Sequence, residues 1–387
     1  MKKPNRLIFY FIVLVIAAFG ACRKPGGSQQ TVNSSEPSHD APVGGTAPTG
    51  EKFYFRGTIT TGSNDLRIEM TLVRDGDRLT GTYFYPKVGK NIALTGTVDK
   101  AGNVELKESD ESGKDTGVFK GKWKPATDSP DPSLSEIEGK WSKPDGSKET
   151  AFLVSQQPIE FSAAVRVSPK VIKETNKEKH YTVDAEYPQI EGDPRFDNFN
   201  REARSLVTKD VAAFKTAETQ ETDTDRETPA ETTDSTLDIR YEIRRATDDL
   251  ISIEFTEWYY ERGAAHGNTN TTVVNYDVKN GKNLALADLF NPNSKYLSVI
   301  SAYCIQTLKD QAKKDKDSML DEDMLKSGAS PRADNYRACS ITTKGLWVTF
   351  DPYQVAPYAA GPQHVLVPYS TLKDILKPDG PVAALAK

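Results

Sequence analysis

His266 lies in the segment ERGAAHGNTNTT (Glu261–Thr272), and it is one of four histidines in the chain. Because small residues flank it, it is the residue best placed to present a reactive group on a tight loop. Such a histidine could act as a general base or a metal ligand, with a carboxylate such as Glu261 or Asp351 as its partner. Either role requires further ligands or a positioned nucleophile. No pair among the chain's histidines has metal-ligand spacing, so we expect no catalytic residue, no metal and no cofactor.

The alternative for His266 is a structural role, in which its ring bonds across to the aromatic segment containing Tyr353 and Tyr358. We favour this structural role. If His266 has a function, we expect it to present the loop to a partner and not to take part in catalysis. Tyr353, Tyr358 and Gly361 lie in a proline-rich loop that could anchor a protein or a glycan. The same loop could equally pack on its own sheet, and the sequence leaves both interpretations open.

The strands and helices expected to position these loops have clear periods in their apolar residues. Alternating apolar residues predict a hairpin over 237–255, which places His266 just beyond a strand end. Strands are also predicted at 345–350 and 364–368, and helices at 196–214 and 296–312. Residues 218–235 are acidic and threonine-rich, and we expect a disordered loop there. Residues 163–377 are therefore predicted to form an α+β domain with an antiparallel sheet and packed helices.

Residues 51–156 show a different pattern, with short alternating strands separated by turn residues such as Asp75-Gly76. Their even spacing predicts an antiparallel all-β barrel or sandwich of about eight strands, so the chain is multidomain. Barrels of this size often bind a ligand inside or at the mouth. Trp123 and Trp141 are interpreted as core residues, with a ligand platform as the alternative.

The N-terminal region predicts where the protein is located. Residues 1–21 have a basic start and a short apolar run, as in a secretory signal peptide. Gly20-Ala21-Cys22 resembles the lipobox of bacterial lipoproteins, which predicts lipidation at Cys22; ordinary cleavage is the alternative. Residues 22–50 read as a lipid anchor and flexible tether. We expect a protein secreted across the inner membrane and held in the bacterial envelope by its lipid, with the choice of membrane open.

The composition excludes one class of partner. The net charge is −5, so there is no basic field to attract nucleic acid. Cys304 and Cys339 are the remaining cysteines of the mature chain, and an oxidising compartment would allow them to pair. We predict a structural disulfide, with two buried free thiols as the alternative.

Three segments carry a family resemblance. They are YYERGAAHG, NYDVKNGKNLALADLFNPNSKYLSVIS and TFDPYQVAPYAAGPQHVLVPYSTLKDIL. Over residues 163–377 the chain resembles the extracellular domain shared by the lysozyme-sensing anti-sigma factor RsiV and the non-catalytic region of the peptidoglycan deacetylase PdaC. The resemblance implies an α+β domain facing the cell wall. The family has Gly-Gly-Ala-His-Gly where this chain has Gly263-Ala-Ala-His-Gly267, so Ala264 should not need a positive φ.

These observations lead to a hypothesis of a non-catalytic envelope lipoprotein that binds a cell-wall component, such as peptidoglycan, or a wall-directed protein such as lysozyme. One alternative is a hydrolase of wall glycans or peptides that uses His266 with nearby carboxylates. Another is a structural lipoprotein involved in envelope assembly. We do not expect an anti-sigma role, because only six residues precede the apolar run. A deacetylase role is not expected either, because a separate catalytic domain does not fit in the chain.

Overall fold

The computed structural model describes residues 50–62, 64–126, 131, 133–220 and 234–386. The predicted signal peptide, Cys22 and residues 22–49 of the predicted tether lie outside this described part. Residues 48–387 form one compact unit, within which three hydrophobic cores can be distinguished. Among the described helices, none is both long and apolar enough to cross a membrane.

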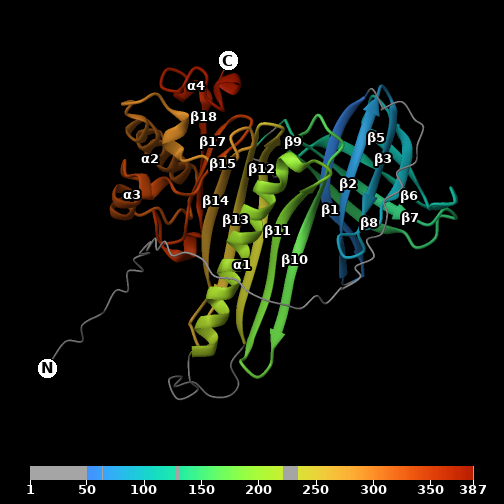
Figure 1. Ribbon diagram of the computed structural model, residues 1–387, viewed down its shortest axis with the longest axis horizontal. Helices are drawn as coiled ribbons and strands as arrows, with labels where there is room; N and C mark the ends of the chain where they lie inside the picture. The colour runs from blue at the N-terminus through green and yellow to red at the C-terminus, as the bar shows by residue number, and fades with distance from the viewer. Residues whose placement is uncertain (1–49, 63, 127–130, 132, 221–233, 387) are drawn as a thin grey trace, which may run out of the picture. The chain divides into compact units, whose positions relative to one another are not determined.

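The first core fills a closed antiparallel barrel of eight strands (Figure 1). The strands are β1 (Glu51–Thr61), β2 (Asn64–Asp75), β3 (Arg78–Phe84), β4 (Ile92–Val98), β5 (Asn103–Ser109), β6 (Asp115–Pro125), β7 (Ser135–Ser142) and β8 (Thr150–Gln157). Alternate residues point inward and are mostly apolar, which is the period that predicted the strands. The structure therefore confirms the barrel, and β1 closes it by pairing with both β2 and β8.

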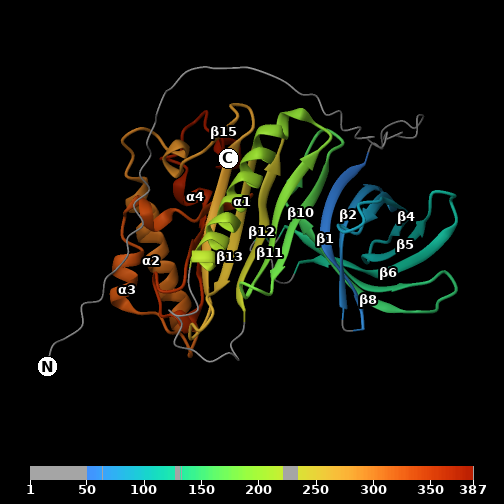
Figure 2. The same cartoon turned by 60° about the horizontal axis from the view of Figure 1, so that its bottom comes forward.

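The second core lies between a long sheet and helix α1 (Asp197–Gln220), which covers one face of the sheet (Figure 2). The sheet strands are β9 (Ile159–Glu160), β10 (Arg166–Asn176), β11 (Tyr181–Glu191), β12 (Ser235–Thr247), β13 (Leu250–Tyr260), β14 (Asn268–Asp277) and β15 (Lys282–Asn283). Buried Phe199, Ala203 and Val207 place the helical stripe on this sheet, as the sequence period predicts.

Two features of the long sheet go beyond the prediction. Strands β11 and β12 pair in parallel, and α1 lies between them in the chain. Parallel neighbours need a long crossover, because a hairpin can join only antiparallel strands. The helix also continues to Gln220, so the first three residues of the predicted disordered loop are helical. Residues 221–233 of that loop lie outside the described part.

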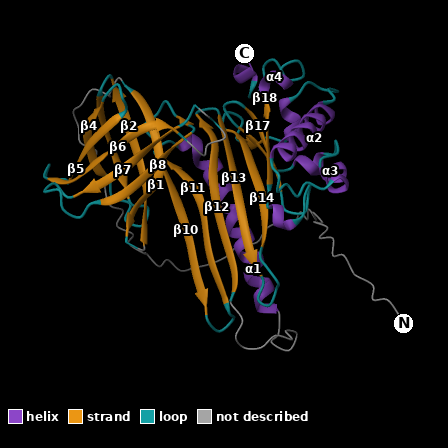
Figure 3. Cartoon of the chain, turned by 180° about the vertical axis from the view of Figure 1, so that it is seen from behind, coloured by secondary structure: helices purple, strands orange, loops and turns teal. Residues whose placement is uncertain are grey.

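The third core belongs to a C-terminal lobe of helices on a small sheet, seen beside the long sheet in Figure 3. Its elements are α2 (Tyr296–Lys314), α3 (Glu322–Gly328), β16 (Cys339–Ile341), β17 (Gly345–Phe350), β18 (Gln363–Pro368) and α4 (Tyr369–Leu372). The domain from 163 to 377 is thus an α+β structure with packed helices, as predicted, and it contains two cores.

The predicted disulfide is not present in the structure. Cys304 and Cys339 are both buried free thiols, and they belong to the same apolar core. Burial raises the pKa of the Cys304 thiol to about 12, so it stays protonated and packs as a small apolar group. The alternative of two buried thiols is the one that the structure contains.

Candidate binding surface

His266 lies on the exposed loop after β13, where its ring stacks on Tyr358. The two ring centroids are 3.9 Å apart and the ring planes differ by 21°. The imidazole Nδ1 lies 2.8 Å from the Gly267 carbonyl oxygen, and because a carbonyl only accepts, Nδ1 is the donor. The predicted partner segment is therefore correct, although the contact is ring stacking and the hydrogen bond is local.

Gly267 connects this loop to two other aromatic residues. The Tyr358 hydroxyl donates to the Gly267 carbonyl oxygen at 2.7 Å. On the other side, a Cβ at position 267 would lie 2.5 Å from the Trp258 ring, so the backbone passes directly against that ring. Trp258 in turn stacks on Tyr260, with ring planes 12° apart. The positive φ in this loop belongs to Gly263, at 85°, and Ala264 has none, as expected.

Tyr353 extends the same group of rings from a strained turn. Its ring lies 5.6 Å from that of Tyr358, between centroids, and the side chain is 53% exposed. The Gln354 N–H donates to the Asp351 carbonyl at 3.0 Å, which closes a turn with Pro352 second and Tyr353 third. Tyr353 has a φ of 70°, at a turn position that normally requires glycine or asparagine. The backbone thus carries strain while holding an aromatic ring in solvent.

Gly361 has a different role from the other predicted binding residues. It ends the short 3-10 helix Tyr358–Ala360, and its φ is 64° with ψ at −171°, a conformation that favours glycine. No atom lies within 4 Å of where its Cβ would be. We therefore assign it to the turn that follows Tyr358.

We call Trp258, Tyr260, His266, Tyr353 and Tyr358 the aromatic cluster. Its members come from three chain segments and are exposed or half-buried, with Trp258 39% exposed. Trp258 and Tyr260 were not among the predicted binding residues, although their i, i+2 spacing at a strand end places both on one face. Grouped, partly exposed rings can stack on the flat apolar face of a sugar or anchor a protein.

The residues of the hydrolase alternative are engaged in other contacts. The Arg337 guanidinium lies 2.6 Å from one oxygen of the buried Asp351 carboxylate. His266 is held between the Tyr358 ring and its own loop backbone. Across the described residues, no three histidine, cysteine or acidic side chains come together in a way that could hold a metal ion.

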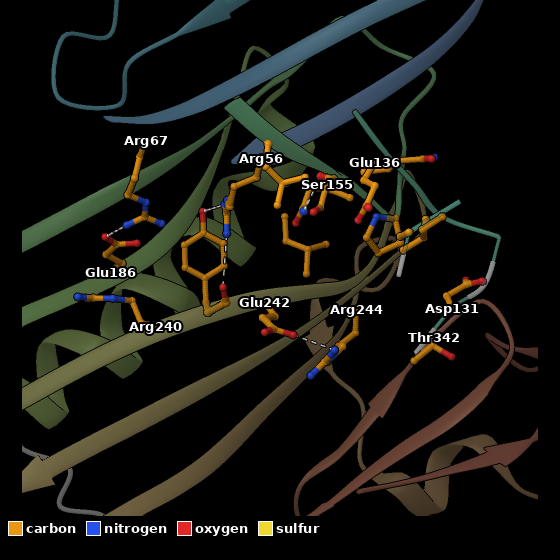
Figure 4. Close-up of a pocket in the computed structure, with 18 of the residues that line it drawn as sticks. Arg56, Arg67, Asp131, Glu136, Ser155, Glu186, Arg240, Glu242, Arg244 and Thr342 are labelled. Atoms are coloured by element: carbon orange, nitrogen blue, oxygen red, sulfur yellow. Dashed lines mark hydrogen bonds and ion pairs between the residues drawn. The ribbon is translucent and has the colours of Figure 1, made fainter. Parts of the chain in front are cut away.

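A cavity of about 530 Å³ lies between the outer face of the barrel and the long sheet (Figure 4). Charged side chains line it, among them Arg56, Arg67, Glu186, Arg240, Glu242 and Arg244. These residues pair with neighbours: Arg67 bonds Glu186, and Arg244 bonds Glu242 at 2.8 Å. Because most of these charged side chains pair with one another, they hold the barrel against the long sheet. They leave little unpaired charge to attract a charged ligand.

Family models match the two chain segments that build the aromatic cluster. Residues 174–269 match the model described as deacetylase PdaC, and residues 287–370 match a protein family of unknown function, DUF3298. A curated relative, the peptidoglycan-N-acetylmuramic acid deacetylase PdaC of Bacillus subtilis (strain 168), is 32% identical over 174 residues. The chain carries a PdaC-like domain.

The shared region is a part of each protein. It spans 45% of this chain and 35% of the Bacillus relative. Two solved DUF3298-family structures are also similar. One, from Bacteroides fragilis, is 18% identical with a TM-score of 0.44, covering 59% of this chain and 99% of its own. The other, from Pseudomonas aeruginosa, is 20% identical with a TM-score of 0.42, covering 56% and 96%. In the PdaC-like domain, Trp258 and His266 come from the first matched segment and Tyr358 from the second.

Proposed function

We propose that this protein is an envelope lipoprotein whose PdaC-like domain is a non-catalytic binding module for the glycan of the cell wall. The observation that carries the proposal is the aromatic cluster, in which Tyr358 stacks on His266 and contacts Tyr353. Flat rings grouped at the surface, next to a strained turn that holds one of them outward, are typical of a recognition site.

The comparison supports the choice of ligand. The Bacillus relative is named as an enzyme that acts on peptidoglycan, so a region shared with it fits a protein that works at the wall. The N-terminal sequence supports the location, because the apolar run ending at Cys22 has the pattern of a lipoprotein signal.

The proposal is tested by calorimetric titration of the purified protein with three ligands. They are peptide-free glycan strands from peptidoglycan, dextran as a polysaccharide lacking N-acetyl groups, and lysozyme. We expect saturable binding of the wall glycan and none of dextran. Binding of lysozyme alone would replace the glycan with a wall-directed protein as the partner. Binding of none of the three would reject a recognition role for the cluster.

The strained turn provides a separate prediction. Tyr353→Gly should raise the free energy of unfolding by about 1 kcal/mol, because glycine adopts the positive φ without steric cost. The same change should weaken glycan binding several-fold, because one exposed ring is lost. Urea unfolding and the glycan titration measure the two effects. A variant that is less stable than the parent would contradict the strain argument.

A further inference from the structure

One end of the barrel contains a buried carboxylate where the inward-facing residues are otherwise apolar. Leu106 and Glu108 are successive inward positions on β5, and Glu108 is only 5% exposed. The apolar core of the barrel surrounds Leu106, whereas Glu108 lies nearer the strand end. A carboxylate removed from water costs free energy unless it is paired or hydrogen-bonded. Packing of the barrel core alone therefore does not explain why a carboxylate is buried at this position.

Two aromatic donors bind one oxygen of this carboxylate. The Tyr83 hydroxyl donates to Oε2 at 2.6 Å, and the Trp141 indole N–H donates to the same atom at 3.0 Å. Burial, and then the hydrogen bond to Glu108, raises the pKa of Tyr83 above its ordinary value. The phenol therefore keeps its proton and remains a donor. In the described part of the chain, no donor is bonded to Oε1, so this oxygen is left for another partner.

The local backbone is shaped around this arrangement. Gly117 lies directly across from Glu108, and the strand register shifts between Glu108 and Ser109. A Cβ at position 117 would lie 2.5 Å from the Trp141 Nε1 and 2.8 Å from the Glu108 Oε1. Only glycine leaves room for both groups, and a bulge of this kind redirects a side chain. The position of the carboxylate is thus built into the barrel.

Aromatic rings form the wall around the carboxylate. Tyr83 packs edge-on against Tyr85, with centroids 5.6 Å apart, and against Phe119, with centroids 5.4 Å apart. Tyr85 and Trp141 are half-buried, so they lie between the core and solvent. A carboxylate oxygen among aromatic side chains can bind an ammonium group through a charged hydrogen bond, and a neighbouring ring can add a cation–π contact. A metal ion would need more oxygen ligands than this single carboxylate.

Two lysines of the barrel, Lys90 and Lys140, are paired with other carboxylates. The Lys90 ammonium lies 3.1 Å from Glu111, and that of Lys140 lies 2.6 Å from Glu149. Both pairs are exposed, and neither involves Glu108. Neither of these two ammonium groups is paired with Glu108, and among the described residues Glu108 takes part in no ion pair shorter than 4.0 Å.

We propose that the barrel end at Glu108 binds a primary alkylammonium group, such as that of a lysine side chain, with Glu108 Oε1 as the acceptor and Trp141 and Tyr85 as the wall. This site shares no residue with the aromatic cluster and does not depend on the proposed glycan binding.

The test uses the full chain and follows its indole N–H resonances by NMR, with Trp141→Phe to assign the relevant one. The probe is Nα-acetyl-lysine methylamide, and the control ligand is the norleucine analogue, which lacks the ammonium. We expect a saturable shift of the Trp141 resonance with the lysine probe, in the millimolar range, and none with norleucine. Equal shifts with both ligands, or no saturable shift with lysine, would overturn the proposal.

Glu108→Gln removes the charge while its amide oxygen can still accept from Tyr83 and Trp141. We expect at least ten-fold weaker binding of the lysine probe to this variant. Glu105→Gln is the matched control, because Glu105 lies on the same strand and pairs with Lys120 on the exposed outer face; it should bind as the parent does. Unchanged affinity in Glu108→Gln would overturn the proposal. If that variant does not fold, Tyr85→Ala decides the matter, with at least three-fold weaker binding expected and unchanged affinity counting against the site.

Discussion

Replacing Arg56 with alanine is expected to lower the free energy of unfolding by about 3–5 kcal/mol, because it breaks a buried ion pair. Arg56 projects from the barrel strand β1, and its Nε lies 2.9 Å from the Glu69 carboxylate. Its guanidinium also bonds the Tyr241 hydroxyl and lies 4.4 Å from the centroid of that ring, on the long sheet. Without Arg56, the carboxylate of Glu69, which is 8% exposed, would stay buried without its partner.

The effect should depend on pH in a defined direction. Burial raises the pKa of Glu69, and Arg56 counteracts that shift. In the alanine variant the folded-state pKa should rise further above the unfolded value, so the folded state binds the proton more tightly. The deficit should therefore shrink as the pH falls from 8 towards 5.

Urea unfolding at both pH values measures the deficit. Arg195→Ala is the matched control, because Arg195 pairs with Asp193 but is 48% exposed, and its loss should cost far less stability than the loss of Arg56. Similar losses in the two variants would show that the contact of Arg56 with the long sheet contributes no special stability.

Tyr358→Ala is expected to weaken binding of wall glycan about thirty-fold, equivalent to about 2 kcal/mol. Tyr358 is the central ring of the aromatic cluster, since it contacts both His266 and Tyr353. Its removal takes away a stacking surface and leaves its two neighbours without support. Calorimetric titration with peptide-free glycan strands measures the loss.

Tyr358→Phe separates the ring from its hydroxyl. The phenyl ring keeps the stacking surface but loses the 2.7 Å hydrogen bond to Gly267, so we expect less than a five-fold loss of affinity. If phenylalanine is as harmful as alanine, Tyr358 serves to hold the loop of His266 and the ring itself does not bind the ligand.

Local patterns predicted much of the fold. Alternating residues at inward positions predicted the eight barrel strands, and the stripe through Phe199, Ala203 and Val207 predicted helix α1. Each of these patterns shows which face of a strand or helix is buried, and the pattern is visible in residues that are close together in the chain. The pairing of segments distant in sequence is not encoded in such periods, which is why the parallel neighbours β11 and β12 were not predicted.

The site was predicted in part for the same reason. His266, Tyr353 and Tyr358 stood out because each lies in an unusual loop, and the structure brings all three together. Trp258 joins them through the backbone of Gly267, a contact with no signal in spacing or composition. The carboxylate of Glu108 was missed because an acidic residue in an alternating strand is ordinarily a solvent-facing one.

The closure of the barrel has a consequence for how neighbouring copies of the chain can associate. Because β1 pairs on one side with β2 and on the other with β8, the central part of the seam has no row of unpaired backbone groups. Open sheet edges are the usual templates on which neighbouring copies add strands and form fibres. The closed barrel therefore offers neighbouring copies no strand edge at this seam, whereas β10 stands at the end of the strand order in the long sheet.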